Sequence, residues 1–344
     1  MQAIRLHPAP QGSPAYTPSN PAPTSALHLD TIPIPKPSAP GEILIRIKAS
    51  TVIRDMLTWP ETYQHEYTIP GNDLSGTVVE VFSPSSKSKF KPGDEVFGMA
   101  NADRGATWAE YAILTENEIA LKPLHLKWEE AAAVPLSGMT AFEALFVHAG
   151  MSIPDDDEDI QENHADRKPQ EDRKKVLITG AAGGVGMYLV QLARIAGVHV
   201  TAATSSTARN KEFLSALGAD ALIEYPALKT QRDVYDIIID TVGGQPLIDS
   251  WGCVKEDGVL ISVDSSSFNF VNEHTNQGIQ RTGIKALFFI VEGGSRALNA
   301  LSRFADLGVL RVFVLTCYPL EKAREAYEYG NGRGSGRGKV VLLI

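Results

Sequence analysis

A glycine-rich turn at residues 180–186 carries the strongest chemical signal in the sequence. Residues 176–179 have the apolar pattern of a buried strand and lead into the turn GAAGGVG. Residues 187–196, which follow the turn, have the pattern of an amphipathic helix. Glycine lets the backbone approach a pyrophosphate closely, and amides at the start of a helix attract its negative charge. Because the turn lies between a strand and a helix, it predicts a dinucleotide site, with a tight structural turn as the alternative. The predicted contacts are Ala182, Gly183, Gly184 and Val185.

The end of the next strand bears on which dinucleotide binds. An acidic side chain there would bind the ribose 2′-hydroxyl of NAD and repel a 2′-phosphate. The strand instead ends in the hydroxyl residues 204–207, and cations follow on the next helix, so NADP is favoured over NAD. The cations could instead form the solvated face of that helix, and the tyrosine after the following strand could merely cap it. The candidate contacts are Ser205, Ser206, Arg209, Lys211 and Tyr225.

Length, charge and composition exclude several classes of protein. The chain has 344 residues, a hydrophobic fraction of 43% and a formal net charge of −9, which is typical of a soluble protein of two domains. No apolar stretch approaches the roughly 20 residues of a membrane span, the proline-broken start lacks a signal-peptide core, and the acidic balance argues against nucleic acid. We expect a cytoplasmic protein with a small-molecule substrate, no membrane or nucleic-acid partner, and a homodimer as the candidate assembly.

The pattern of elements changes along the chain. Residues 1–125 contain short strands bounded by Pro, Gly and Ser, which indicate an all-β unit. From residue 126, helix-length stretches alternate with buried strands, as in a doubly wound parallel sheet of the Rossmann type in an α/β protein. The closing apolar run KVVLLI is expected to return to the first unit. The predicted domains are therefore a β domain of residues 1–125 and 292–344, and a nucleotide-binding domain of residues 126–291.

Residues 154–175 interrupt the second domain. They combine many carboxylates and several basic residues with almost no apolar side chains, which predicts a disordered, solvated insertion. An acidic partner-docking arm or a cation site is the alternative.

Ten segments in order resemble the medium-chain dehydrogenase/reductase superfamily, in particular its zinc-free quinone oxidoreductase and enoyl reductase branch. They are IPIPKPSAPGEILIRIKAS, RDML, GNDLSGTVVEV, KPGDEVFG, WAEYA, AAAVPLSGMTAFEAL, GAAGGVG, LGAD, DTVGG and GRGKVVLLI. The resemblance implies a GroES-like β domain formed by both chain ends, a Rossmann domain in the middle, and NADP(H) bound in the cleft between them.

The resemblance also assigns further cofactor contacts. In the family, a threonine in the segment PLSGMTA lies near the nicotinamide, the loop DTVGG lies near the ribose, the segment FFIVEGG follows the nicotinamide edge, and a lysine near the C-terminus contacts the phosphate or the nicotinamide side. The corresponding residues are Thr140, Thr241, Val242, Gly243, Phe288, Phe289, Val291 and Lys339.

The same resemblance, read residue by residue, predicts chemistry without a metal ion. Zinc-dependent relatives have a cysteine near RDML, a His-Glu pair where this chain has Asn72 and Asp73, and four clustered cysteines. This chain has only Cys253 and Cys317, and none of its eight histidines lies in a typical ligand spacing. We therefore expect no metal site.

The region around residue 53 departs from the family, which often has Asn or Tyr there, near the substrate oxygen. This chain has Val52 and Ile53, so the catalytic residues are unknown, and an enolate would be protonated by water or by a side chain such as Tyr63. Arg54 and Asp55 are expected to form a local ion pair. The candidate substrate-pocket residues are Ile53, Trp59 and Tyr63, with core packing as the alternative for the aromatic residues.

These observations predict a zinc-independent NADPH-dependent oxidoreductase that reduces quinones or the activated C=C bond of enones and enoyl substrates. The alternatives are an accessory trans-acting enoyl reductase of polyketide-type biosynthesis and a non-catalytic NADPH-binding protein.

Overall fold

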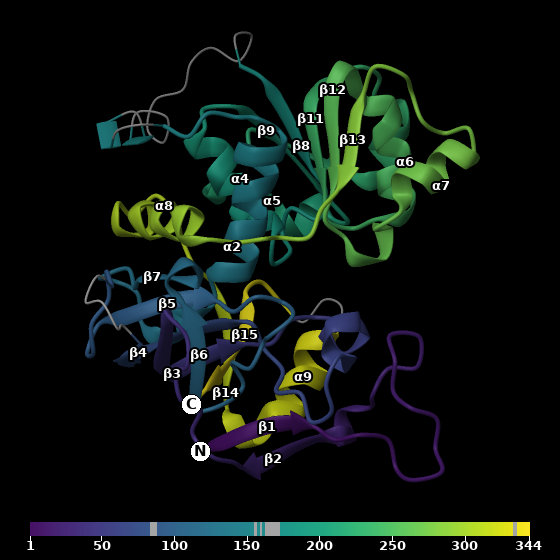
Figure 1. Cartoon of the computed structure of the whole chain (residues 1–344). Coiled ribbons are helices and arrows are strands. Elements are labelled where there is room, and N and C mark those ends of the chain that lie inside the picture. Colours follow the sequence, from purple (N-terminus) through teal and green to yellow (C-terminus); the bar gives the residue numbers. More distant parts are fainter. Residues whose placement is uncertain (83–87, 155–156, 159, 162–172, 333–335) are drawn as a thin grey trace. The chain divides into compact units, whose positions relative to one another are not determined.

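The computed structural model describes residues 1–344 except 83–87, 155–156, 159, 162–172 and 333–335. Its contacts divide the chain into two compact units. Unit 1 comprises Met1–Leu136, Glu292–Asp306 and Val312–Ile344, and unit 2 comprises Ser137–Val291 and Leu307–Arg311. Both ends of the chain therefore belong to unit 1 (Figure 1).

Unit 2 contains a six-stranded sheet of order β10-β9-β8-β11-β12-β13, in which every neighbouring pair is parallel. The strands form because their apolar side chains are buried; β8, for example, reads KVLI, and its three apolar residues are fully buried. The expected doubly wound α/β fold is confirmed. The strands are β8 (Lys175–Ile178), β9 (His199–Thr204), β10 (Ala221–Glu224), β11 (Tyr235–Asp240), β12 (Val254–Ser262) and β13 (Lys285–Phe288).

Helices cover both faces of this sheet. Those between β8 and β10 pack on one half, and those between β11 and β13 pack on the other half (Figure 1). The β-α-β crossover connections are right-handed throughout, and the direction in which strands are added reverses beside β8. The two groups of helices therefore lie on opposite faces of the sheet. The helices are α4 (Gly186–Ile195), α5 (Thr207–Leu217), α6 (Gly244–Cys253) and α7 (Phe270–Asn276).

Unit 1 contains a seven-stranded sheet with the path β14-β15-β3-β4-β5-β7 and with β6 paired to β3. A separate antiparallel ribbon joins β1 to β2. The last strand pairs with β3, so segments near both ends of the chain build one sheet. The strands are β1 (Gln2–Leu6), β2 (Leu27–Thr31), β3 (Glu42–Thr51), β4 (Asp73–Val81), β5 (Glu95–Met99), β6 (Tyr111–Thr115), β7 (Ile119–Leu121), β14 (Val314–Pro319) and β15 (Lys339–Leu343).

Residues 126–136 belong to unit 1, although their helical pattern assigned them to the nucleotide-binding domain. Helix α1 (Trp128–Ala132) packs Ala132 against Ala49 and Val341, and the Trp128 carbonyl accepts a hydrogen bond from Ser75 Oγ. The next helix, α2 (Pro135–Phe142), starts at a proline, which ends the first helical run. Most of α2 lies in unit 2, which begins at Ser137, and the other helices of unit 1 are α8 (Ser295–Asp306) and α9 (Ala323–Asn331).

The insertion expected at residues 154–175 lies mostly outside the described residues. Ile160, which is described, is fully buried, so this residue at least contributes to a core. Among the described helices, none has the length and apolarity needed to cross a membrane.

Candidate nucleotide-binding site

The glycine-rich turn follows β8 at the carboxyl edge of the sheet of unit 2. Gly180 has a φ of +62°, and a Cβ there would lie 2.2 Å from Thr241 Oγ1. Gly180 thus makes the tight turn for which the fingerprint normally has a glycine one residue later. A Cβ on Gly186 would lie 2.2 Å from the Gly180 carbonyl oxygen, so the start of α4 can approach the strand only with glycine at this position.

The backbone between these two glycines is open to a ligand. The amides of Ala182, Gly184 and Val185 donate no hydrogen bond to any described residue, and Gly183 is exposed. A Cβ on Gly184 would meet only Ser137 Oγ, at 3.8 Å. Free amides beside open space at the start of a helix of 10 residues fit the pyrophosphate of a dinucleotide.

Asp240, at the end of β11, holds the neighbouring loop in place. Its buried carboxylate accepts four hydrogen bonds of 2.6–3.3 Å, from Thr179 Oγ1, Val242 N, Gly243 N and Ser262 Oγ. Burial raises the pKa of Asp240, against the effect of these four donors. Thr241 is held in turn by Thr179, through its amide at 3.1 Å and its hydroxyl at 2.9 Å. The motif DTVGG pointed to this loop, but sequence reasoning missed Asp240 as its anchor.

The hydroxyl residues after β9 are less available than expected. Thr204 is buried, and its hydroxyl accepts a hydrogen bond from Asn210 Nδ2 at 2.7 Å. Thr207 donates from both its amide and its hydroxyl to Glu224 Oε1, at 2.8 and 2.9 Å. With Ser206 Oγ, which accepts the Arg209 amide, three of the four hydroxyls already have partners, and an acid from the end of β10 reaches this position. Sequence reasoning missed Glu224 because it looked for an acid only at the end of β9.

The other predicted contacts in this region lie at the surface. Ser205 is exposed, and Ser206 caps α5 by accepting the Arg209 amide at 3.4 Å. Both Arg209 and Lys211 are exposed, within the first two turns of α5.

Tyr225 follows β10 and reaches across to the glycine-rich turn. Its hydroxyl accepts a hydrogen bond from the Gly180 amide at 3.3 Å, and burial raises its pKa. The tyrosine thus connects two of the predicted contact segments instead of only ending its strand.

The remaining predicted contacts of unit 2 lie on two other segments. Thr140 is buried on α2, one turn after Ser137. Phe288 ends β13, and the next residue, Phe289, stacks its ring 4.1 Å from that of His148. Val291 is half-buried. Since all strands are parallel, the turns after β8, β9, β10 and β11 and the end of β13 lie at one edge of the sheet.

Lys339 is the predicted contact that lies in unit 1. Its ammonium is 3.5 Å from Asp73 Oδ2, and both side chains are buried. The same Asp73 oxygen accepts the Thr51 hydroxyl at 2.5 Å, and Oδ1 accepts the Leu136 amide at 2.6 Å. Asp73 therefore holds together the ends of β3, β15 and the start of α2.

The candidate substrate-pocket residues pack in the core of unit 1. Ile53 is buried, and Trp59 and Tyr63 are half-buried against the same apolar cluster. The Tyr63 hydroxyl donates to the Leu57 carbonyl and accepts the Ala22 amide at 2.9 Å. This is the core-packing alternative for the aromatic residues, and the tyrosine proton is already in use. The expected ion pair of Arg54 and Asp55 is present at 3.2 Å, near the surface.

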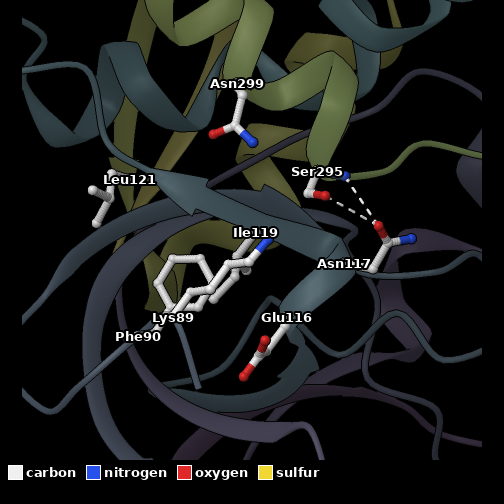
Figure 2. Close-up of a pocket in the computed structure, with 8 residues that line it drawn as sticks. All are labelled: Lys89, Phe90, Glu116, Asn117, Ile119, Leu121, Ser295 and Asn299. Carbon is white, nitrogen blue, oxygen red and sulfur yellow. Dashed lines mark hydrogen bonds between the residues drawn. The ribbon is translucent and has the colours of Figure 1, made fainter. Parts of the chain in front are cut away.

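A shallow hollow of about 340 Å³ lies in unit 1 between β7 and α8 (Figure 2). Figure 2 shows Ser295, at the start of α8, donating to Asn117 from its amide at 3.3 Å and its hydroxyl at 3.2 Å. Ser302, further along α8, donates to the Leu121 carbonyl. These bonds hold α8 on β7 and on the short turn of Glu116–Glu118 before it, and no predicted site residue lines the hollow.

Two family models match the chain. The alcohol dehydrogenase GroES-like domain matches residues 39–124, which supports the expected GroES-like unit, and the zinc-binding dehydrogenase model matches residues 217–342.

Individual proteins match over most of the chain. It is 36% identical over 332 residues to a probable zinc-binding mitochondrial oxidoreductase of Arthroderma benhamiae, covering 94% of each chain. It is 31% identical to 2-methylene-furan-3-one reductase of Solanum lycopersicum, over 80% of this chain and 63% of that protein. Among solved structures, the quinone oxidoreductase from Coxiella burnetii has 26% identity and a TM-score of 0.78, over 100% of this chain and 99% of that one.

Proposed function

Because the chain belongs to the medium-chain dehydrogenase/reductase superfamily, we propose that it is a zinc-independent, NADPH-dependent reductase of quinones or of the activated C=C bond of enones and enoyl substrates. The observation that carries the proposal is the open backbone cradle at Gly183 and Gly184. When bound, the reduced nicotinamide supplies the hydride. The amides of the cradle would hold the pyrophosphate, and Asp240 would keep Val242 and Gly243 in position beside the ribose.

Buried Asp73 supports a mechanism without zinc. Its two oxygens accept hydrogen bonds from Leu136 and Thr51, and the Lys339 ammonium lies beside it. A zinc ion here would have to displace this cation and would find none of the Cys or His donors it prefers. Among the described residues, no three His, Cys, Asp or Glu side chains are grouped to hold a metal ion. The donor set therefore does not fit zinc, although relatives are named for it.

Without a Lewis acid, a carbon already activated by conjugation is the easiest acceptor for a hydride. A quinone ring and the β-carbon of an enone meet this need, and the names of two similar proteins point to the same two classes. Because the single proton of the Tyr63 hydroxyl is already donated to the Leu57 carbonyl, we assign protonation of the product to water. The cytoplasmic location and the homodimer stay predictions.

The test combines binding, turnover and elemental analysis of the purified full-length chain. NADPH should bind at least about tenfold tighter than NADH, and it should be oxidised in the presence of simple quinones or enones. A chelator should leave turnover unchanged. One zinc per chain that turnover requires would contradict the metal-free mechanism, and tight NADPH binding without turnover of any acceptor would favour a non-catalytic NADPH-binding protein.

A further inference from the structure

We propose that Glu224 determines how strongly this chain distinguishes NADPH from NADH. In this assignment the carboxylate repels the 2′-phosphate of NADPH and accepts a hydrogen bond from the 2′-hydroxyl of NADH. The inference rests on the proposed cofactor site and adds a specificity-determining residue to it.

The position of Glu224 carries the argument. It is the last residue of β10, next to β9 in the parallel sheet, so both strands end at the same edge. Glu224 Oε1 accepts two hydrogen bonds from Thr207, the first residue of α5. The carboxylate thus lies beside the segment after β9, which contacts the adenosine ribose in a nucleotide-binding fold of this type.

Glu224 and the cations of α5 would have opposite effects on a 2′-phosphate bound beside Thr207. The Thr207 amide and hydroxyl, which would otherwise be free to bind a 2′-phosphate, already donate to Glu224. These bonds lower the pKa of the Glu224 carboxyl, which is therefore ionised at neutral pH. A phosphate of roughly −1.5 to −2 charge placed here would meet a carboxylate as well as the cations of α5.

The second carboxylate oxygen gives the residue its selective effect. Glu224 Oε2 accepts no hydrogen bond from a described residue, so it can accept one from a ribose hydroxyl. A 2′-phosphate has no such proton to donate when it is fully ionised, and it is repelled instead. Arg209 and Lys211 act in the opposite direction, so the preference for NADPH is set by the balance between these three residues.

The test compares Glu224→Gln with Glu212→Gln. Glutamine keeps an oxygen that can accept from Thr207 but removes the charge, while Glu212→Gln removes one charge from the exposed surface of α5. Equilibrium binding of NADPH, NADH and the fragments 2′,5′-ADP and 5′-AMP is measured for each protein, together with its melting temperature. Glu224→Gln should raise the affinity ratio of NADPH over NADH by about tenfold, and Glu212→Gln should change it by less than about twofold.

Salt provides a second measurement. The gain in 2′,5′-ADP affinity caused by Glu224→Gln should shrink as ionic strength rises, because exposed charges are screened. An unchanged ratio in a folded Glu224→Gln protein, or the same gain in both variants, would overturn the inference and leave the proposed function standing. If the unaltered chain binds neither NADPH nor NADH, the proposed function itself fails.

Discussion

The Lys339 ammonium lies 3.5 Å from the Asp73 carboxylate, which links the first residue of the last strand to the first residue of β4. Both side chains are almost completely buried, and the Thr51 hydroxyl binds the same carboxylate oxygen. The two residues therefore form a buried ion pair that connects segments far apart in the sequence.

Removing only the cation should destabilise the protein strongly. Lys339→Met leaves Asp73 buried without its partner, which typically costs about 3–5 kcal/mol. Unfolding in denaturant would measure the loss. The double variant Asp73→Asn with Lys339→Met should recover part of it, since no lone charge remains, and Lys322→Met at an exposed position serves as the control. Equal stability of the single and double variants would contradict an ionic role for the pair.

Two glycines of the phosphate-binding turn should respond differently to alanine. A Cβ at Gly184 enters open space, so Gly184→Ala should keep the melting temperature and weaken NADPH binding by about tenfold or more, because the methyl group blocks close approach of the pyrophosphate. A Cβ at Gly186 would collide with the Gly180 carbonyl oxygen, so Gly186→Ala should lower the melting temperature. Thermal melts and nucleotide titrations separate the two effects, and loss of stability in Gly184→Ala would count against the open cradle.

Asp240→Asn should loosen the loop that follows β11. Each carboxylate oxygen accepts two hydrogen bonds, so an amide NH₂ in place of one oxygen faces two donors and cannot satisfy them. A cost of about 1–3 kcal/mol in stability follows, together with weaker NADPH binding. The matched control is Asp257→Asn, at an exposed residue. Similar unfolding curves for the two variants would contradict the anchoring role.

Stability should fall as the solution becomes mildly acidic. His274 Nδ1 accepts the Trp251 Nε1 hydrogen bond at 2.8 Å, which requires the neutral ring, and burial lowers the pKa of His274. A histidine whose pKa is lowered in the folded state stabilises the fold fully only above its unfolded pKa of about 6.5. The melting temperature should therefore fall as pH decreases through this value.

The variant His274→Asn should show a smaller fall, because its amide oxygen can still accept from Trp251 and does not titrate in this range. His199 is also buried with a lowered pKa, so part of the fall should remain. Replacement of the exposed His125 by Gln is the control, and identical pH profiles for His274→Asn and the unaltered chain would exclude His274 as a cause.

Local patterns made much of this molecule predictable. The strand, glycine turn and helix at residues 176–196 are adjacent in sequence, so their geometry follows from periodicity and glycine chemistry. What sequence reasoning missed depends on pairing between strands. Glu224 meets Thr207 only because β10 lies beside β9, and Asp240 meets Thr179 only because β11 lies beside β8. Helix α1 was assigned to the wrong unit because its hydrophobic pattern shows only that one face is buried. The pattern does not show which of the two sheets that face packs against.

The topology of unit 1 also has a consequence for synthesis on the ribosome. Strand β15 pairs with the end of β3 and with β14, so this edge of the sheet can be completed only after residues 339–343 are synthesised. At about 5–20 residues per second, the roughly 290 residues between the two strands take about 15–60 s to translate. All strands of unit 2 emerge within that interval, so unit 2 can fold while the end of β3, already paired with β4, still lacks β15 as its second neighbour. During this time the nascent chain exposes an apolar strand end, where chaperones that hold extended segments would have their opportunity to bind.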